Sequence, residues 1–108
     1  MLKRHQNTEQ RRCLFMYKCV RIKVSYPHTE VQMVRQALEQ QARDLGIEGV
    51  MRRREDSSYD IIISGAKERV DTFIEAIAHY KDENKVSAFE VEAAVKERDY
   101  RGVFRVIE

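Results

Sequence analysis

The fold is decided by the stretch VQMVRQALEQQARDLGIEGVMRRREDSSYDIIISG, which runs from Val31 to Gly65. In its first half, apolar residues recur every three or four positions, the spacing that places side chains on one face of an α-helix. This apolar face consists of Val31, Val34, Ala37, Leu38, Ala42 and Leu45. Glycine is favoured directly after the last helical turn, so we expect the helix to end at Gly46.

The second half of the stretch predicts two β-strands, Ile47–Glu55 and Tyr59–Ser64. The later strand carries an unbroken isoleucine run, and the short polar turn at residues 56–58 is typical of a hairpin connection. Upstream, Val20, Ile22 and Val24 alternate with polar residues in a further strand, which Pro27 ends.

Downstream of the hairpin, the apolar residues first recur at helical spacing. They then recur at the spacing of two further strands. The second apolar helix face is formed by Val70, Phe73, Ile74, Ile77 and Tyr80 or Lys81. Apolar residues at every second position predict a fourth strand with Phe89, Val91, Ala93 and Val95 on one side. Residues 102–107 predict a short fifth strand.

The resulting order, β-α-β-β-α-β followed by a short C-terminal edge strand, indicates an α+β, ferredoxin-like fold. We expect an antiparallel sheet with two helices, near residues 30–45 and 67–81, on one face. A chain of 108 residues supports one hydrophobic core, hence one domain. Its polar, charged beginning predicts a flexible tail over residues 1–15, with the domain over 16–108.

Composition restricts the partners. The net charge of +2 is weak evidence for nucleic acid. Cys13 and Cys19 lack C-x-x-C spacing, and His5, His28 and His79 share no ligand spacing with them, so we expect neither metal nor cofactor. No apolar run approaches the roughly 20 residues that span a bilayer, which favours a cytoplasmic protein without a membrane partner.

The helix-to-strand junction reads Ala42-Arg43-Asp44-Leu45-Gly46-Ile47-Glu48-Gly49-Val50. It resembles the acylphosphatase signature, in which a helix ends as A-x-x-L-G and turns through a glycine into a strand. Residues 64–70 resemble the strand end and second-helix start of that family, and residues 102–107 resemble its closing F-x-I strand. The resemblance spans about residues 20–108.

This resemblance implies hydrolysis of a carboxyl-phosphate anhydride, without metal or covalent intermediate. An arginine and loop amides hold the phosphoryl group, and an asparagine orients the attacking water, so placement governs the rate. The position of the catalytic arginine falls on Arg35, seven residues before Ala42. The asparagine position falls on Arg53, which makes efficient catalysis doubtful.

The phosphate loop of the family, V-x-G-x-V-Q-G-V-x-F-R, corresponds to Val24–Arg35, where both glycines are absent. Thr29 and Gln32 instead form the pattern of a capping box, which places Arg35 in the second helical turn. Glu30 adds a negative charge where phosphate would dock. His28, Thr29 and Arg35 are the residues that we predict to bind an anion, although a loop histidine and a helix arginine paired with Glu39 are ordinary surface features.

Two functions stay open. One is an acylphosphatase-like domain with lost or weak hydrolysis that keeps a small phosphorylated ligand or inorganic anion near Arg35. The other is a non-catalytic module that binds protein or RNA through a sheet edge or through a basic sheet face with Arg52, Arg53 and Arg54. Alternation places Arg52 and Arg54 on one face and Arg53 on the other.

An RNA-binding sheet also needs aromatic side chains that stack on bases. Tyr26 and Tyr59 are the plausible contributors, and Glu55 and Asp56 dilute the basic cluster, so we favour a solvated strand with cross-strand ion pairs. The sequence gives no indication of the oligomeric state.

Overall fold

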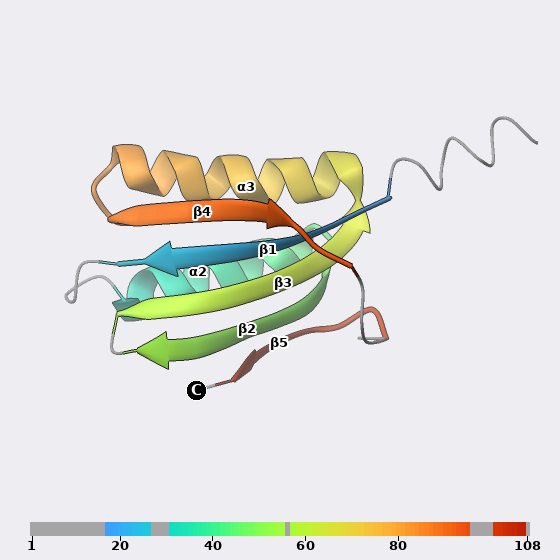
Figure 1. Ribbon diagram of the computed structural model, residues 1–108, viewed down its shortest axis with the longest axis horizontal. Helices are drawn as coiled ribbons and strands as arrows, with labels where there is room; N and C mark the ends of the chain where they lie inside the picture. The colour runs from blue at the N-terminus through green and yellow to red at the C-terminus, as the bar shows by residue number, and fades with distance from the viewer. Residues whose placement is uncertain (1–16, 27–30, 56, 96–100, 108) are drawn as a thin grey trace, which may run out of the picture.

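A computed structural model describes residues 17–26, 31–55, 57–95 and 101–107 (Figure 1). In chain order its elements are β1 (Tyr17–Ser25), α2 (Val31–Asp44), β2 (Glu48–Glu55), β3 (Ser58–Ala66), α3 (Lys67–Asp82), β4 (Ala88–Ala93) and β5 (Phe104–Ile107). Every predicted helix and strand is confirmed, and β3 extends beyond its predicted ends on both sides. The predicted tail at residues 1–15 lies outside the described residues.

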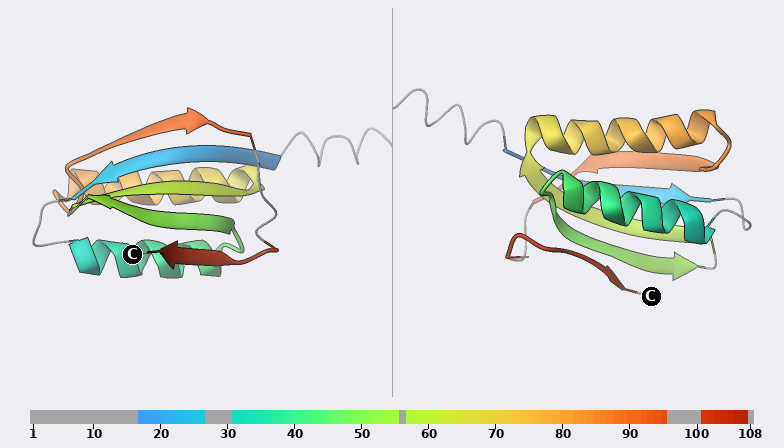
Figure 2. Two further views of the ribbon diagram at one scale, coloured as in Figure 1. Left: turned by 60° about the horizontal axis from the view of Figure 1, so that its bottom comes forward. Right: turned by 180° about the vertical axis from the view of Figure 1, so that it is seen from behind.

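The strands form one sheet in the order β4-β1-β3-β2-β5. Neighbours from β4 to β2 pair antiparallel, whereas β5 runs parallel to β2. Both helices lie on the same side (Figure 2), so the sheet has a helix-covered face and an open face. The ferredoxin-like α+β architecture is thus confirmed. The direction of β5 could not be predicted, because side chains alternate in the same way in parallel and antiparallel strands.

The core fills the space between the sheet and the two helices. Its helical part is at most 1% exposed and consists of Val34, Leu38 and Ala42 from α2 with Val70, Phe73 and Ile77 from α3. The central strands β1 and β3 contribute Val20, Ile22, Val24, Tyr59, Ile61 and Ile63. Phe104 closes the core from β5, with its ring centroid 6.5 Å from that of Phe73. Most of the apolar residues predicted for the helix faces, and all three predicted for β1, therefore lie in the core or pack against it.

The outer strand β4 differs from its prediction. It ends at Ala93, so Val95 lies beyond it and is 81% exposed. Val91 pairs with Ile22 and therefore points to the helix-covered side, yet it remains 40% exposed. An edge strand has a neighbour on one side only, which leaves its apolar side chains partly uncovered even where the alternation is correct.

The end of α2 follows the predicted glycine stop. Gly46 has a φ of +68°, a conformation that glycine adopts without steric cost. The Ile47 N–H donates a hydrogen bond to the Ala42 carbonyl over 3.0 Å, which turns the chain into β2. Because α2 ends where β2 begins, its first turns lie at the other end of the sheet, close to the end of β1.

Candidate functional site

Arg35 lies in the second turn of α2, as predicted, and points toward the protein. Its side chain is 16% exposed and is therefore largely covered by the protein. Its Nη1 donates a hydrogen bond to Glu39 Oε1 over 3.3 Å, which confirms the predicted pair at i and i+4. A guanidinium in this largely buried position is oriented before any ligand arrives.

Glu39 also holds a second arginine. Its other oxygen, Oε2, lies 2.8 Å from Nη2 of Arg43, which is 54% exposed. One carboxylate therefore faces two cations, and the three side chains together keep a positive charge. Arg35 is more buried than Arg43. Water therefore screens the charge of Arg35 less than that of Arg43.

Tyr26 lies directly after β1 and is 3% exposed. Its ring meets that of Tyr59 edge-on, with centroids 5.6 Å apart and planes at 68°. Among the described residues, the Tyr26 hydroxyl has no hydrogen-bond partner. Burial raises the pKa of this hydroxyl far above its ordinary value and Tyr59 adds to the rise, whereas the nearby Arg35 guanidinium opposes it.

Arg53 lies on the helix-covered side of the sheet, as Tyr59 does. It stands directly opposite Tyr59 in the pairing of β2 with β3, and opposed residues of an antiparallel pair share a face. Tyr59 contacts Tyr26, and Tyr26 lies within the electrostatic reach of Arg35. We call Tyr26, Arg35, Arg53 and Tyr59 the arginine–tyrosine cluster. Two of its members are the predicted site residues Arg35 and Arg53, which come from positions far apart in the sequence.

The remaining predicted anion-binding residues, His28 and Thr29, lie outside the described residues, as does Glu30. The cluster also contains two tyrosines that the sequence analysis considered only for a different role. Tyr26 and Tyr59 were the plausible contributors to base stacking in the less favoured RNA-binding alternative, but they are at most 3% exposed and lie on the helix-covered face. Tyr26 and Tyr59 each lie two positions from a buried residue of the same strand run, Val24 and Ile61. This alternation could have placed both tyrosines in the core.

The open face carries Arg52, which stands opposite Asp60, so the predicted separation of Arg52 from Arg53 is confirmed. Arg21 binds Asp60 through Nη2 at 2.7 Å and Nε at 3.2 Å. The Arg21 hydrogen bonds lower the pKa of Asp60, and Arg54 and Lys23 are close enough to lower it further. The basic residues of this face therefore surround a buried carboxylate.

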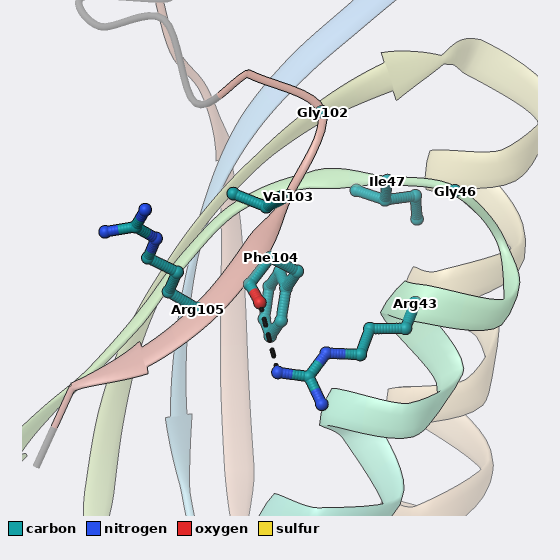
Figure 3. Close-up of a pocket in the computed structure, with 7 residues that line it drawn as sticks. All are labelled: Arg43, Gly46, Ile47, Gly102, Val103, Phe104 and Arg105. Atoms are coloured by element: carbon teal, nitrogen blue, oxygen red, sulfur yellow. Dashed lines mark hydrogen bonds between the residues drawn. The ribbon is translucent and has the colours of Figure 1, made fainter.

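A shallow pocket of about 370 Å³ lies at the C-terminal end of α2, away from Arg35 (Figure 3). Arg43 and Arg105, which line it, lie on opposite sides of β5. The Arg43 Nη2 is 3.5 Å from the Phe104 carbonyl oxygen and serves to attach α2 to β5. This pocket brings no predicted site residues together.

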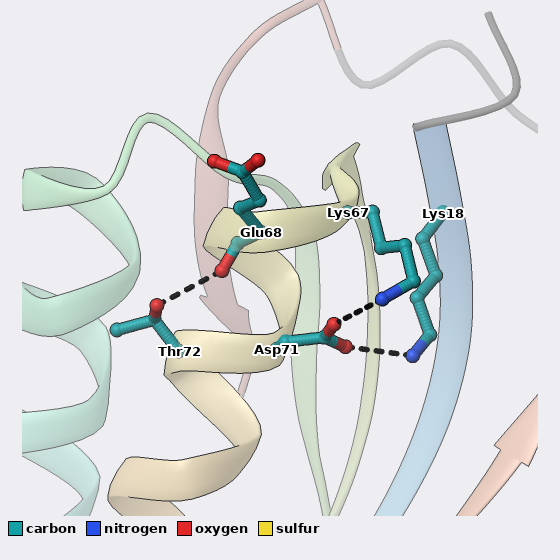
Figure 4. A network of polar contacts seen from close by, with 5 residues as sticks. All are labelled: Lys18, Lys67, Glu68, Asp71 and Thr72. Carbon is teal, nitrogen blue, oxygen red and sulfur yellow. Dashed lines mark hydrogen bonds and ion pairs between the residues drawn. The ribbon is translucent and has the colours of Figure 1, made fainter. Parts of the chain in front are cut away.

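A second polar network joins α3 to β1 (Figure 4). Asp71 accepts hydrogen bonds from Lys18 at 2.7 Å and from Lys67 at 2.8 Å. These two bonds lower the pKa of Asp71, and its carboxylate raises the pKa of Lys67. The network is fully paired, which fits a structural role.

Among the residues that the structure describes, no group of three or more histidine, cysteine, aspartate or glutamate side chains could hold a metal ion. Within the same residues, no helix has both the length and the apolar character needed to span a membrane.

The acylphosphatase family model matches residues 21–106. An acylphosphatase structure from Coxiella burnetii matches with a TM-score of 0.65 and 21% identity, over 83% of this chain and 92% of that chain. One from Bacillus subtilis matches with a TM-score of 0.62 and 21% identity, over 86% and 100% of the two chains.

A third solved structure, HypF from T. kodakarensis, matches with a TM-score of 0.67 and 19% identity, over 84% of this chain and 12% of that chain. At these identities the solved structures establish a shared fold, which in HypF is one part of a longer chain. The comparison with curated proteins gives no match.

Proposed function

Because this chain belongs to the acylphosphatase family, we propose that it binds a phosphoryl group at Arg35 and hydrolyses acyl phosphates only weakly. The observation that carries the proposal is the position of Arg35. Its side chain is 16% exposed, and its guanidinium is bonded to Glu39 near the buried Tyr26. A planar guanidinium offers paired hydrogen bonds to phosphoryl oxygens, and low exposure strengthens them.

Arg53 is the reason to expect weak hydrolysis. Family resemblance puts a water-orienting asparagine at this position, and an asparagine can both accept from and donate to a water molecule. A guanidinium has donors only, and it attracts the anion more than it orients a nucleophile. Arg53 therefore favours the bound ground state of the phosphoryl group over attack by water.

The chain keeps part of the chemistry that the family resemblance implies. Arg35 can neutralise the phosphoryl oxygens and hold them in place, which contributes binding energy. In-line attack also requires a water fixed on the far side of the phosphorus, and this step depends on orientation. The chain keeps the cation Arg35 but has Arg53 in place of the water-orienting asparagine. Phosphate binding can therefore persist while turnover is lost.

Phosphate titration followed by NMR, together with a benzoyl phosphate assay, tests this proposal. Wild type should bind phosphate and hydrolyse benzoyl phosphate barely above background. Arg35→Ala should weaken phosphate binding about tenfold, since it removes charge-assisted hydrogen bonds. Arg52→Ala is the matched control, because it removes the same charge from the open face and should leave the affinity unchanged.

The outcomes separate the two functions. Robust turnover that Arg35→Ala abolishes would restore a full enzyme. Loss of affinity in Arg52→Ala but not in Arg35→Ala would favour binding on the open face instead. That face is the weaker candidate, because Asp60 lies among its cations and Glu90 stands opposite Lys23.

A further inference from the structure

Two buried side-chain hydroxyls, those of Tyr26 and Ser64, have no hydrogen-bond partner among the described residues. Tyr26 is 3% exposed and Ser64 0%. Burying an unpaired hydroxyl is unfavourable, so each instance calls for a cause. The two lie at opposite ends of β1, since Tyr26 follows its last residue and Ser64 pairs with Cys19 near its start.

The surroundings of Tyr26 distinguish it from Ser64. The Tyr59 ring fixes the Tyr26 ring edge-on, and the Arg35 guanidinium lies close enough to influence its hydroxyl. A guanidinium has donors but no acceptor, so it cannot receive the hydroxyl proton. Two neighbouring groups therefore present N–H and O–H donors on the helix-covered face. An oxyanion supplies acceptors for both.

Resting on the phosphate site proposed at Arg35, we infer that the Tyr26 hydroxyl donates a hydrogen bond to an oxygen of the bound phosphoryl group. The hydroxyl stays protonated at neutral pH, because burial raises its pKa. The two glycines of the family's phosphate loop, which let backbone amides converge on one anion, are absent from this sequence. The ligand is a phosphate monoester, an acyl phosphate or inorganic phosphate, because all three carry phosphoryl oxygens that can accept this hydrogen bond.

Tyr26→Phe tests the inference with little change in shape. The variant should raise the dissociation constant for inorganic phosphate about tenfold, because it removes a hydrogen bond to a charged acceptor. It should also raise the Tm of the ligand-free protein by roughly 4 °C, since the unpaired hydroxyl is gone. A residue that only supports the fold would not show these opposite effects.

Ser64→Ala is the matched control. It removes the other unpaired hydroxyl at the far end of β1, so it should raise the Tm while the phosphate affinity stays at the wild-type value. In wild type, the ¹³Cζ resonance of Tyr26 should shift on phosphate titration more than that of Tyr59, since its hydroxyl bonds the ion.

Three results would overturn the inference. If Arg35→Ala loses phosphate binding and Tyr26→Phe keeps it, the site at Arg35 stands and the role of Tyr26 does not. A lower Tm in Tyr26→Phe would show that the hydroxyl is already bonded in the free protein. If wild type binds no phosphate, the proposed function and the role of Tyr26 fail together.

Discussion

Arg53 is the residue at which this chain departs most clearly from the catalytic pattern that its family resemblance implies. It stands opposite Tyr59 and therefore shares the face of the arginine–tyrosine cluster. We predict that Arg53→Asn weakens phosphate binding several-fold, since it removes a cation near the anion, and does not restore turnover. The loop glycines would still be absent.

Phosphate titration and the benzoyl phosphate assay measure both halves of this prediction, and Arg52→Asn on the open face is the control. Substantial hydrolysis by Arg53→Asn would show that one residue blocks an otherwise working site. Unchanged phosphate affinity would instead place Arg53 out of reach of the ligand.

The pairing of Arg35 with Glu39 could be predicted from the sequence, because residues four apart lie together on a helix. The burial of Arg35 and its approach to Tyr26 could not, because they depend on how α2 packs against strands from other parts of the chain. The same holds for Arg21 and Asp60, which are joined only once β1 and β3 are paired in register. Local spacing predicts local pairs, and tertiary packing decides which of them are buried.

At the scale of elements, β2 can pair closely with β3 because Gly49 has no side chain. Its φ is +150°, and an added Cβ would overlap the Ile62 carbonyl and lie 2.8 Å from the Ile63 Cα. Gly49→Ala should therefore reduce the free energy of unfolding by about 3 kcal/mol, combining backbone strain with steric overlap. Chemical denaturation measures this loss.

Gly102→Ala provides the matched comparison. Gly102 also has a positive φ, +73°, but an added Cβ there meets nothing within 4 Å. It should cost only about 1 kcal/mol, the penalty of the left-handed conformation alone. Equal losses in the two variants would mean that β2 moves away from β3 and relieves the overlap at Gly49.

The elements themselves could be predicted well because each has its own period. The helix faces of α2 and α3 and the alternation of β1 are visible in single segments, and all three lie in the core. The exposure of Val91 and the parallel direction of β5 depend on sheet order, which no single segment contains. The register shift between Arg53 and Glu55 is likewise a property of the paired strands.

At the scale of the whole molecule, the two faces of the sheet divide the charges differently. On the open face Lys23 stands between Glu90 and Asp60, and Asp60 stands between Lys23 and Arg52, so the signs alternate across four strands. On the helix-covered face, the cluster holds Arg35 and Arg53 beside two tyrosines. Alternating charges suit pairing within the sheet, whereas the two arginines beside buried hydroxyls, with Glu39 bonded to Arg35, suit an anionic ligand. This contrast favours the helix-covered face as the binding side.

Acid should reveal how much the open face contributes to stability. The pKa of Asp60 is lower in the folded protein, chiefly because of its hydrogen bonds to Arg21, than the ordinary value of about 3.9 in an unfolded chain. A depressed carboxylate pKa stabilises the fold above the unfolded value, and this contribution is lost as the pH falls through the folded value. The pKa of Asp71 is lowered in the same direction by Lys18 and Lys67.

We therefore predict that the free energy of unfolding of wild type declines between about pH 5 and pH 2. Asp60→Asn should lose about 1 kcal/mol at pH 7, a small figure because Arg21 is 40% exposed and water screens the pair. Its decline with acid should be shallower, because the protonation of Asp60 no longer contributes. Asp82→Asn, which removes an exposed carboxylate of α3, should keep the wild-type slope. Urea denaturation across this pH range measures the free energy of unfolding of all three proteins. If Asp60→Asn and wild type lose stability in parallel, the protonation of Asp60 does not contribute to the acid sensitivity of the fold.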